Sequence, residues 1–326
     1  MSRIRRRQFL FAAGALLAAP FGADAQPAAK VHRIGWLSAA SPTSSLEFEA
    51  LQHGLRRLGY VEGRNLAFEA RWAEGNSAAL PALARSLVER KVDVICGAGT
   101  QASLAAKQAT TTIPIVTVVA FPVQSGLVAS LARPGGNVTG VAFVGEEYGK
   151  RLELLREVSP RLARVALFYN DQNPASILAM KETQRWAQQL RMTLEPQGVH
   201  DRESVDKALA AMAKNLPGAL MTTADPIVTS LRREIAAFAA RHRLLSMHPD
   251  YAVVEAGGLM YYGTSASVMW GQAATYVQRI LQGTKPADLP IEQPMKFDLA
   301  VNLKTAKTLG ITIPRSVLMR ADRVIE

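Results

Sequence analysis

The feature of this chain that most constrains its fold is a repeated alternation of short β-rich runs with helical patterns. From residue 31 onward the unit recurs at about 30 residues, the length of one βα unit. We expect strands at residues 31–37, 66–72, 92–96 and 113–119, and helices at 48–58, 83–88 and 100–110. This alternation is typical of a parallel sheet that helices cover on both faces.

The same pattern starts again after Gly135-Gly136. Further strands are predicted at residues 164–169, 193–199, 220–223, 244–247 and 259–262, with helices at 175–190, 204–213 and 227–241. Asp201 stands where a helix N-cap is expected. The βα pattern extends over more residues than one doubly wound sheet normally contains. We therefore predict an α/β fold with two doubly wound parallel-sheet lobes.

Ligands bind such sheets beyond the carboxyl ends of the strands, where helix N-termini offer backbone N–H groups. Polar and aromatic residues at these positions are the candidate ligand-binding residues: Ser38, Ser41, Thr100, Gln101, Phe121, Asn170, Asp225 and Tyr262. The first four could bind a carboxylate, and Asn170 and Asp225 would contact the ligand from the other lobe. Phe121 and Tyr262 could sandwich an apolar or aromatic group. The alternative roles are helix capping for the serines, Thr100 and Asp225, and core packing for the two aromatic rings.

No catalytic, metal or cofactor site is expected. The five histidines lack metal-ligand spacing, and no G-x-S-x-G motif is present. Cys96, the one cysteine, lies in an apolar run and is interpreted as a core residue. Residues 97–102 fit G-x-G-x-x-A, but no acid follows at the distance that a dinucleotide site needs. A small-residue turn with backbone N–H groups at a cleft is the preferred interpretation, and a nucleotide-using enzyme is the alternative.

The N-terminus carries an export signal. Arg5, Arg6 and Arg7 precede a short apolar run, and Ala23-Asp24-Ala25 supplies a small-x-small cleavage pattern. We predict a signal peptide over residues 1–25, cleaved near Ala25, and hence a periplasmic protein. Arg6-Arg7-Gln8-Phe9-Leu10 resembles a twin-arginine signal, and a membrane anchor is the alternative to cleavage. The formal net charge of +11 includes the arginines of this predicted signal peptide, and the basic residues of the rest of the chain are scattered, which predicts no nucleic-acid partner.

Four segments resemble a family of bacterial solute-binding proteins of ABC transporters that includes the tryptophan/tyrosine-binding receptors. They are residues 58–66 (LGYVEGRNL), 126–140 (GLVASLARPGGNVTG), 285–294 (KPADLPIEQP) and 302–310 (NLKTAKTLG). The resemblance implies a type I periplasmic-binding-protein fold with a three-segment hinge and no catalysis. The expected lobes are residues 27–144 plus 264–289, and 145–263 plus 290–326.

Two departures from the family pattern concern the ligand. Phe121-Pro122-Val123 stands where many relatives carry Asp-Pro-Val, and Met260-Tyr261-Tyr262-Gly263 stands where Met-Ser-Tyr-Gly is common. Asp225 could supply the missing acid. The resemblance implies a receptor that captures a small amino-acid-like or aromatic metabolite and presents it to an inner-membrane permease. Capture of one solute in one cleft requires no second copy of the chain, so we expect a monomer. A ligand sensor for a signalling partner is the alternative.

Overall fold

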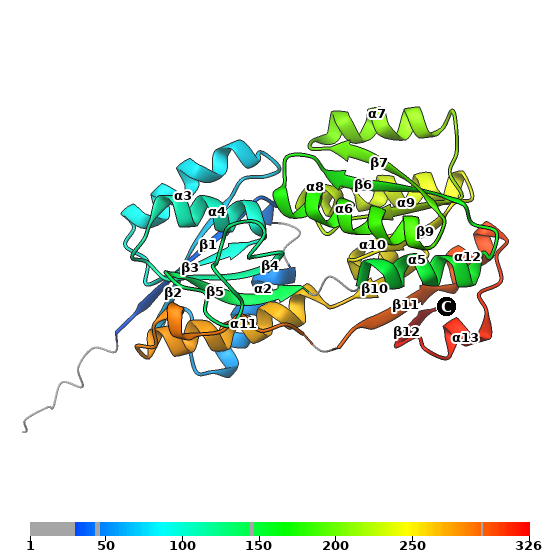
Figure 1. The fold of residues 1–326 in the computed structure, drawn as a ribbon. Helices are drawn as coiled ribbons and strands as arrows, with labels where there is room; N and C mark the ends of the chain where they lie inside the picture. Colours follow the sequence, from blue (N-terminus) through cyan, green and yellow to red (C-terminus); the bar gives the residue numbers. More distant parts are fainter. Residues whose placement is uncertain (1–29, 43–45, 144–146, 295) are drawn as a thin grey trace, which may run out of the picture. The chain divides into compact units, whose positions relative to one another are not determined.

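The computed structural model describes residues 30–42, 46–143, 147–294 and 296–326 (Figure 1). The predicted signal peptide lies outside these residues. Residues His32–Glu326 form one compact unit. Among the described residues, no helix is both long and apolar enough to cross a membrane.

The N-terminal sheet has the strand order β2-β1-β3-β4-β5, and all of its neighbouring strands are parallel. Its strands are β1 (His32–Ser38), β2 (Leu66–Trp72), β3 (Val94–Ala98), β4 (Ile115–Ala120) and β5 (Val138–Phe143). Four of these lie within two residues of the predicted strands, and β5 was not predicted. Its helices are α2 (Leu46–Arg57), α3 (Leu80–Glu89), α4 (Thr100–Ala109) and α11 (Ala266–Leu281). We call this assembly the first lobe.

The second sheet has the order β12-β11-β10-β9-β8-β6-β7 and is parallel except for the β10–β11 pair. Its strands are β6 (Arg164–Asn170), β7 (Thr193–Val199), β8 (Ala219–Thr222), β9 (Leu245–His248), β10 (Met260–Gly263), β11 (Asp298–Asn302) and β12 (Arg323–Ile325). Its helices are α5 (Glu147–Val158), α6 (Pro174–Gln189), α7 (Arg202–Met212), α8 (Pro226–Ser230), α9 (Arg232–Arg241), α10 (Tyr251–Glu255), α12 (Leu303–Leu309) and α13 (Arg315–Leu318). We call this assembly the second lobe. The predicted fold class is confirmed.

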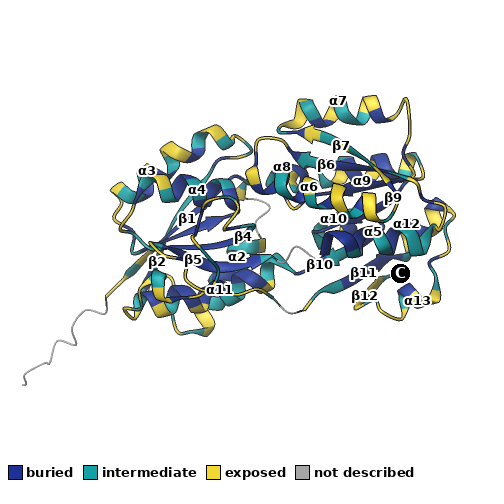
Figure 2. Ribbon diagram, in the orientation of Figure 1, coloured by how far each residue is buried: buried dark blue, intermediate teal, exposed yellow. Residues whose placement is uncertain are grey.

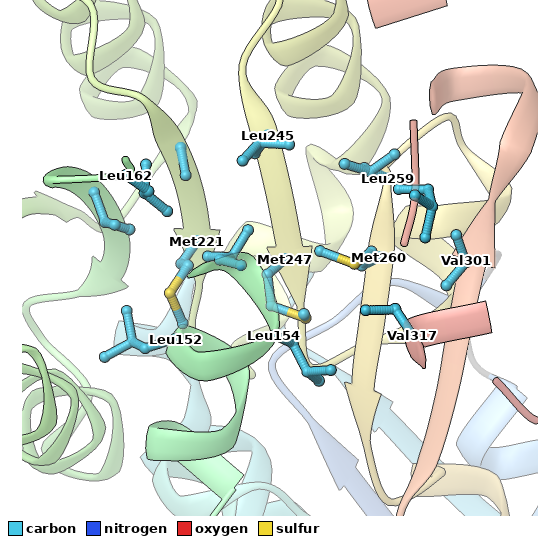
Figure 3. Close-up of a cluster of buried hydrophobic side chains, with 14 of the residues drawn as sticks. Leu152, Leu154, Leu162, Met221, Leu245, Met247, Leu259, Met260, Val301 and Val317 are labelled. Atoms are coloured by element: carbon cyan, nitrogen blue, oxygen red, sulfur yellow. The ribbon is translucent and has the colours of Figure 1, made fainter. Parts of the chain in front are cut away.

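Helices cover both faces of each sheet, because successive strand residues point to opposite sides. In β1, Trp36 packs toward α2 and α11, while Leu37 packs toward α3 and α4. The inner strands are buried along most of their length, whereas the edge strands β2, β7 and β12 are partly exposed, and much of the remaining exposure is on the outer helix surfaces (Figure 2). In the second lobe, Met221, Met247 and Met260 come from three adjacent strands into one apolar cluster (Figure 3).

The predicted helix over residues 227–241 is wrong in one respect, because the structure breaks it into α8 and α9 at Leu231. Leu231 has φ −100° and ψ 20°, outside the helical region. Buried apolar residues continue on both sides of the break, so their spacing gives no sign of it. Asp201 caps α7 as predicted, in a capping box with Ser204.

The chain passes between the lobes three times. It leaves the first lobe after β5 and returns after β10 to form α11, which packs against α2 and β4. After α11, the chain still contacts the first lobe at Glu292, which forms a β-bridge with Val141 of β5. The chain then enters β11 of the second lobe.

Candidate functional site

The strand ends of the first lobe carry several of the predicted residues. Ser38 ends β1, is buried, and its Oγ accepts a hydrogen bond from the Ala40 N–H at 3.1 Å, so it stabilises the turn that follows. Ser41 lies in that turn and is partly buried. Thr100 is buried in the first turn of α4. The residue before it, Gly99, has a φ of 83° that allows the sharp turn, and it provides no side-chain cap for the helix. The glycine-rich segment is thus a tight strand-to-helix turn.

Gln101 joins the two lobes. Its Nε2 donates to the backbone oxygen of Gln172 at 3.2 Å, and its Oε1 lies 3.2 Å from the Ser77 hydroxyl, which donates to it. Gln101 follows β3 of the first lobe, whereas Gln172 follows β6 of the second. The carboxyl ends of these two strands therefore approach each other, as the two-lobe prediction requires.

Asp225 lies at the centre of a buried polar cluster in the second lobe. Its Oδ1 accepts from Asn170 Nδ2 at 3.1 Å and from the Ile227 N–H at 3.0 Å, and its Oδ2 accepts from Asn173 Nδ2 at 2.8 Å. Burial raises the pKa of this carboxyl, and the hydrogen bonds from Asn173 and Asn170 oppose that shift. Asp225 is thus the N-cap of α8, which was the alternative to a ligand-binding role.

The two aromatic residues that were predicted to sandwich a ligand group each stack on another ring of the chain. Phe121 stacks on Tyr148 with centroids 6.0 Å apart and planes 10° apart. Tyr262 stacks on Phe297 with centroids 5.7 Å apart and planes 16° apart. Phe121 also has a φ of 53°, a backbone conformation that bulky residues rarely adopt. The structure therefore places each ring against a ring of the chain itself.

A buried ion pair connects these two aromatic pairs. Arg151 Nη2 lies 2.8 Å from Glu147 Oε1, and Arg151 Nε donates to the backbone oxygen of Tyr262 at 2.7 Å. The guanidinium carbon lies 5.3 Å from the centroid of the Tyr148 ring. Burial raises the pKa of Glu147, and the charge of Arg151 opposes that shift. The cluster lies where the chain enters α5 and where it leaves β10.

A cavity of about 350 Å³ lies at the junction of the lobes, beside Phe121. Phe121 and Phe143 line it from the first lobe, and Glu182, Arg185 and Trp186 of α6 line it from the second. Its size falls at the lower end of the range for small-molecule sites. Sequence reasoning identified only Phe121 here, since helix α6 carries no periodic or motif signal that marks these three residues as functional.

The residues that suggested other chemistry lie in ordinary structural positions. Cys96 is buried in β3, and burial raises the pKa of its thiol, so it is a core residue as predicted. His248 is buried in β9, where its Nδ1 lies 3.0 Å from the Thr222 hydroxyl. Within the described ranges, no three His, Cys, Asp or Glu side chains form a group that could hold a metal ion.

Comparison with known proteins decides the family. The model of the ABC transporter substrate binding protein family matches residues 40–325. The chain belongs to this family. The members of this family are substrate-binding proteins rather than enzymes. They bind small molecules and work with ABC permeases.

Individual relatives resemble this family member in sequence, and the two solved structures among them have the same fold. A "conserved domain protein" of Vibrio cholerae is 29% identical, with a TM-score of 0.86 over 90% of this chain and 100% of that one. An ABC domain from Streptococcus pneumonia in complex with L-Trp is 26% identical, with a TM-score of 0.85 over 91% of this chain and 100% of that one. A tyrosine-binding protein of Clostridioides difficile is 25% identical over 78% of this chain and 73% of its own length.

Proposed function

We propose that this chain is the exported receptor of an ABC importer, which captures a small amino-acid-like or aromatic metabolite between its lobes and delivers it to a permease. The observation that carries the proposal is the Gln101–Gln172 hydrogen bond, because it brings the carboxyl ends of β3 and β6 together. Ligands of open α/β sheets bind at such ends. The proposal includes a periplasmic, monomeric protein whose signal peptide ends near Ala25.

Polar groups that could hold a ligand gather around this contact. Ser38, Thr100 and Gln101 lie on the first lobe, and Asn170 and Asp225 lie on the second. The amides and hydroxyls suit a small polar molecule, and the rings near Phe121 suit an aromatic group. The complexes of relatives with L-Trp and the tyrosine-binding relative support an amino-acid-like ligand.

Closure would follow from contacts that a ligand makes to both lobes. A molecule that contacts only one lobe binds the open and the closed form equally well, so it does not shift the equilibrium between them. A ligand held by residues after β3 and after β6 contacts both. Burial of an aromatic group contributes roughly 4–6 kcal/mol and each charge-assisted hydrogen bond about 1.5–3 kcal/mol. After the costs of immobilisation and closure, micromolar affinity is reachable.

Native mass spectrometry of the purified mature protein, followed by calorimetry with L-tyrosine, L-tryptophan, benzoate and myo-inositol, tests the proposal. We expect a retained small molecule, or binding of an aromatic or amino-acid ligand with micromolar affinity. Uptake of that ligand should fall in cells that lack this protein. A protein that retains nothing and binds none of the panel, or cells whose uptake is unchanged, would contradict the proposal.

A further inference from the structure

The turns at the amino ends of the second-lobe strands carry basic residues and no acids. Five turns lead from a helix into the parallel strands β6 to β10, at residues 159–163, 190–192, 213–218, 242–244 and 256–259. Their charged residues are Arg161, Arg191, Lys214 and Arg243. In the first lobe, by contrast, the turns at residues 58–65 and 90–93 each contain an acid as well as a base. The excess of positive charge is therefore particular to this edge of the second lobe.

A cavity of about 430 Å³ opens at the same edge, and we call it the amino-end cavity. Three arginines line it, Arg161, Arg164 and Arg243, and no acid of the described part of the chain does. The rest of the lining is largely apolar and includes Val158, Leu162, Leu245 and Ile311. Leu162 and Leu245 belong to the apolar cluster of the second lobe (Figure 3). The volume lies within the range for small-molecule sites, which combine apolar walls with a few polar groups.

The protein uses the hydrogen-bonding capacity of these arginines unequally. Arg164 Nε donates to Glu195 Oε1 at 2.6 Å, and its Nη1 donates to Asn215 Oδ1 at 3.1 Å, so this side chain is held in place. Arg161 and Arg243 form no side-chain hydrogen bond or ion pair with the described residues. A guanidinium group presents several N–H donors that match the oxygens of an anion. The two unused guanidinium groups therefore favour an anion with several acceptor oxygens.

Helix C-termini also lie at this edge, and cations near them are common because they interact favourably with the last carbonyl groups. Such a role needs no cavity. It applies equally to Arg191, which lies outside the cavity lining, and to Arg243, which lies within it. Both residues follow a helix in the same left-handed conformation, with φ of 55° and 52°. Comparison of these two arginines therefore separates ligand binding from interaction with a helix end.

We propose that the amino-end cavity is a second binding site, which holds the phosphoryl group of an amphiphilic phosphate ester between Arg161 and Arg243 and its apolar chain against the apolar lining. A phosphoryl group suits the arginines because its oxygens accept hydrogen bonds from more than one guanidinium group. The chain suits the lining because its burial removes apolar surface from water. The ester is a free metabolite or the headgroup of a membrane lipid, since both present the same chemistry.

This site is separate from the region between the lobes. Strand β6 (Arg164–Asn170) begins at the amino-end cavity and ends next to Gln172, which contacts the first lobe. Its seven residues span roughly 20 Å. The proposal therefore does not depend on the proposed function, and a ligand could occupy either site without contact with the other.

Calorimetry of the purified mature protein with butyl phosphate, inorganic phosphate and butanol tests the chemistry of the site. Butyl phosphate should bind at one saturable site. Inorganic phosphate, which lacks the chain, should bind at least about tenfold more weakly, and butanol, which lacks the anion, should give no binding heat. Arg161→Gln and Arg243→Gln should each weaken butyl phosphate about tenfold. Arg191→Gln is the matched control and should leave the affinity unchanged, and urea denaturation verifies that each variant is folded.

Sedimentation with phosphatidylcholine vesicles, with and without phosphatidic acid, distinguishes the two sources of the ester. Binding to the phosphatidic acid vesicles alone, reversed by butyl phosphate, supports the site and identifies a lipid headgroup. Binding of butyl phosphate without vesicle binding supports the site and identifies a free ester. A wild-type protein that does not bind butyl phosphate would overturn the proposal. Equal weakening in Arg191→Gln and Arg243→Gln would overturn it too, because the effect would then come from the charge of the whole edge.

Discussion

Glu147 and Arg151 form an ion pair of 2.8 Å in which the two side chains are 4% and 2% exposed. They are separated by one helical turn at the start of α5, and Arg151 also reaches the Tyr262 carbonyl across the lobe. A charge in this position is tolerated only because it is paired and hydrogen-bonded. The pair therefore connects the entry of the chain into the second lobe with its exit from β10.

Loss of one partner of this pair should destabilise the protein strongly. Arg151→Met leaves the Glu147 carboxylate buried and unpaired, so the free energy of unfolding should fall by about 3–5 kcal/mol in urea denaturation. Lys207→Met breaks the exposed Glu203–Lys207 pair, which has the same i,i+4 spacing, and should cost at most about 1 kcal/mol. The double change Glu147→Leu, Arg151→Met should recover part of the loss. Equal effects of the two single changes would show that the burial of the Glu147–Arg151 pair does not matter.

The buried His248 predicts a particular pH dependence. Burial lowers its pKa from the usual 6.5 to about 3, with a smaller contribution from the charge of Arg151. Between these two values the unfolded chain binds a proton that the folded chain does not, so stability falls as the pH falls. The slope from this group is about 1.4 kcal/mol for each pH unit.

Comparison with His248→Asn isolates that slope from the other titrating groups. Urea denaturation of both proteins at several pH values between about 3.5 and 6.5 should show a steeper loss for the wild type. Glu47, whose pKa is raised to about 7 by burial and by Asp250, titrates in both proteins and cancels in the difference. Parallel curves would mean that His248 takes up its proton normally in the folded state.

Removal of Asp225 should cost stability. Asp225→Ala deletes the cap of α8 and leaves the amides of Asn170 and Asn173 without their acceptor, so we expect a loss of about 3 kcal/mol or more. Asp201→Ala deletes an exposed cap on α7 and should cost about 1 kcal/mol. Thermal unfolding of the two variants compares their losses of stability. A stable Asp225→Ala protein with unaltered melting would refute the structural role of the cluster.

Gln101→Ala should weaken ligand binding with little effect on stability. The side chain forms one hydrogen bond to the other lobe, worth about 0.5–1.5 kcal/mol, which corresponds to a roughly 2- to 10-fold rise in the dissociation constant. Calorimetry with the ligand that the protein retains measures the change, and small-angle scattering reports closure. Gln188→Ala, an exposed change on α6, should alter neither. If the Gln101→Ala protein binds the ligand as tightly as the wild type does, the Gln101–Gln172 hydrogen bond does not stabilise the closed form.

Gly140 in β5 should tolerate no side chain. Its φ is 145°, and an added Cβ would collide with the backbone oxygen and nitrogen of Thr117 in the neighbouring strand. Gly140→Ala must therefore separate β4 from β5, and we expect insoluble or strongly destabilised protein. Gly59→Ala, at a φ of 88° with open space around it, should cost only about 1–2 kcal/mol. Similar melting temperatures for the two variants would contradict this difference.

Most strands could be predicted from the sequence because short β-rich runs alternate regularly with helical patterns. Residues 66–72 and 193–199 were predicted with the bounds that the structure has. The break at Leu231 could not be predicted, since apolar spacing continues through it. β5 was not among the predicted strands, although it lies inside the residues predicted to form the first lobe.

The candidate site was less accessible to sequence reasoning. Rules for strand ends led to Gln101, Asn170 and Asp225, which do lie near the carboxyl ends of their sheets. The Arg151–Tyr262 contact joins residues 111 positions apart, and no local pattern signals it. Likewise the stacking partners of Phe121 and Tyr262 depend on how the three passages between the lobes are packed.

The return of the chain to form α11 has a consequence for biosynthesis. Trp270 of that helix packs against Trp36 of β1 with ring centroids 4.7 Å apart. The first strand to be synthesised therefore completes its packing only after a helix near the end of the chain has been made. During translation the Trp36 face of the first lobe is covered by α2 alone, without α11, until some 280 residues have emerged. A nascent chain stalled before that point exposes the Trp36 face, and a chaperone that holds it should matter more here than for two lobes made one after the other.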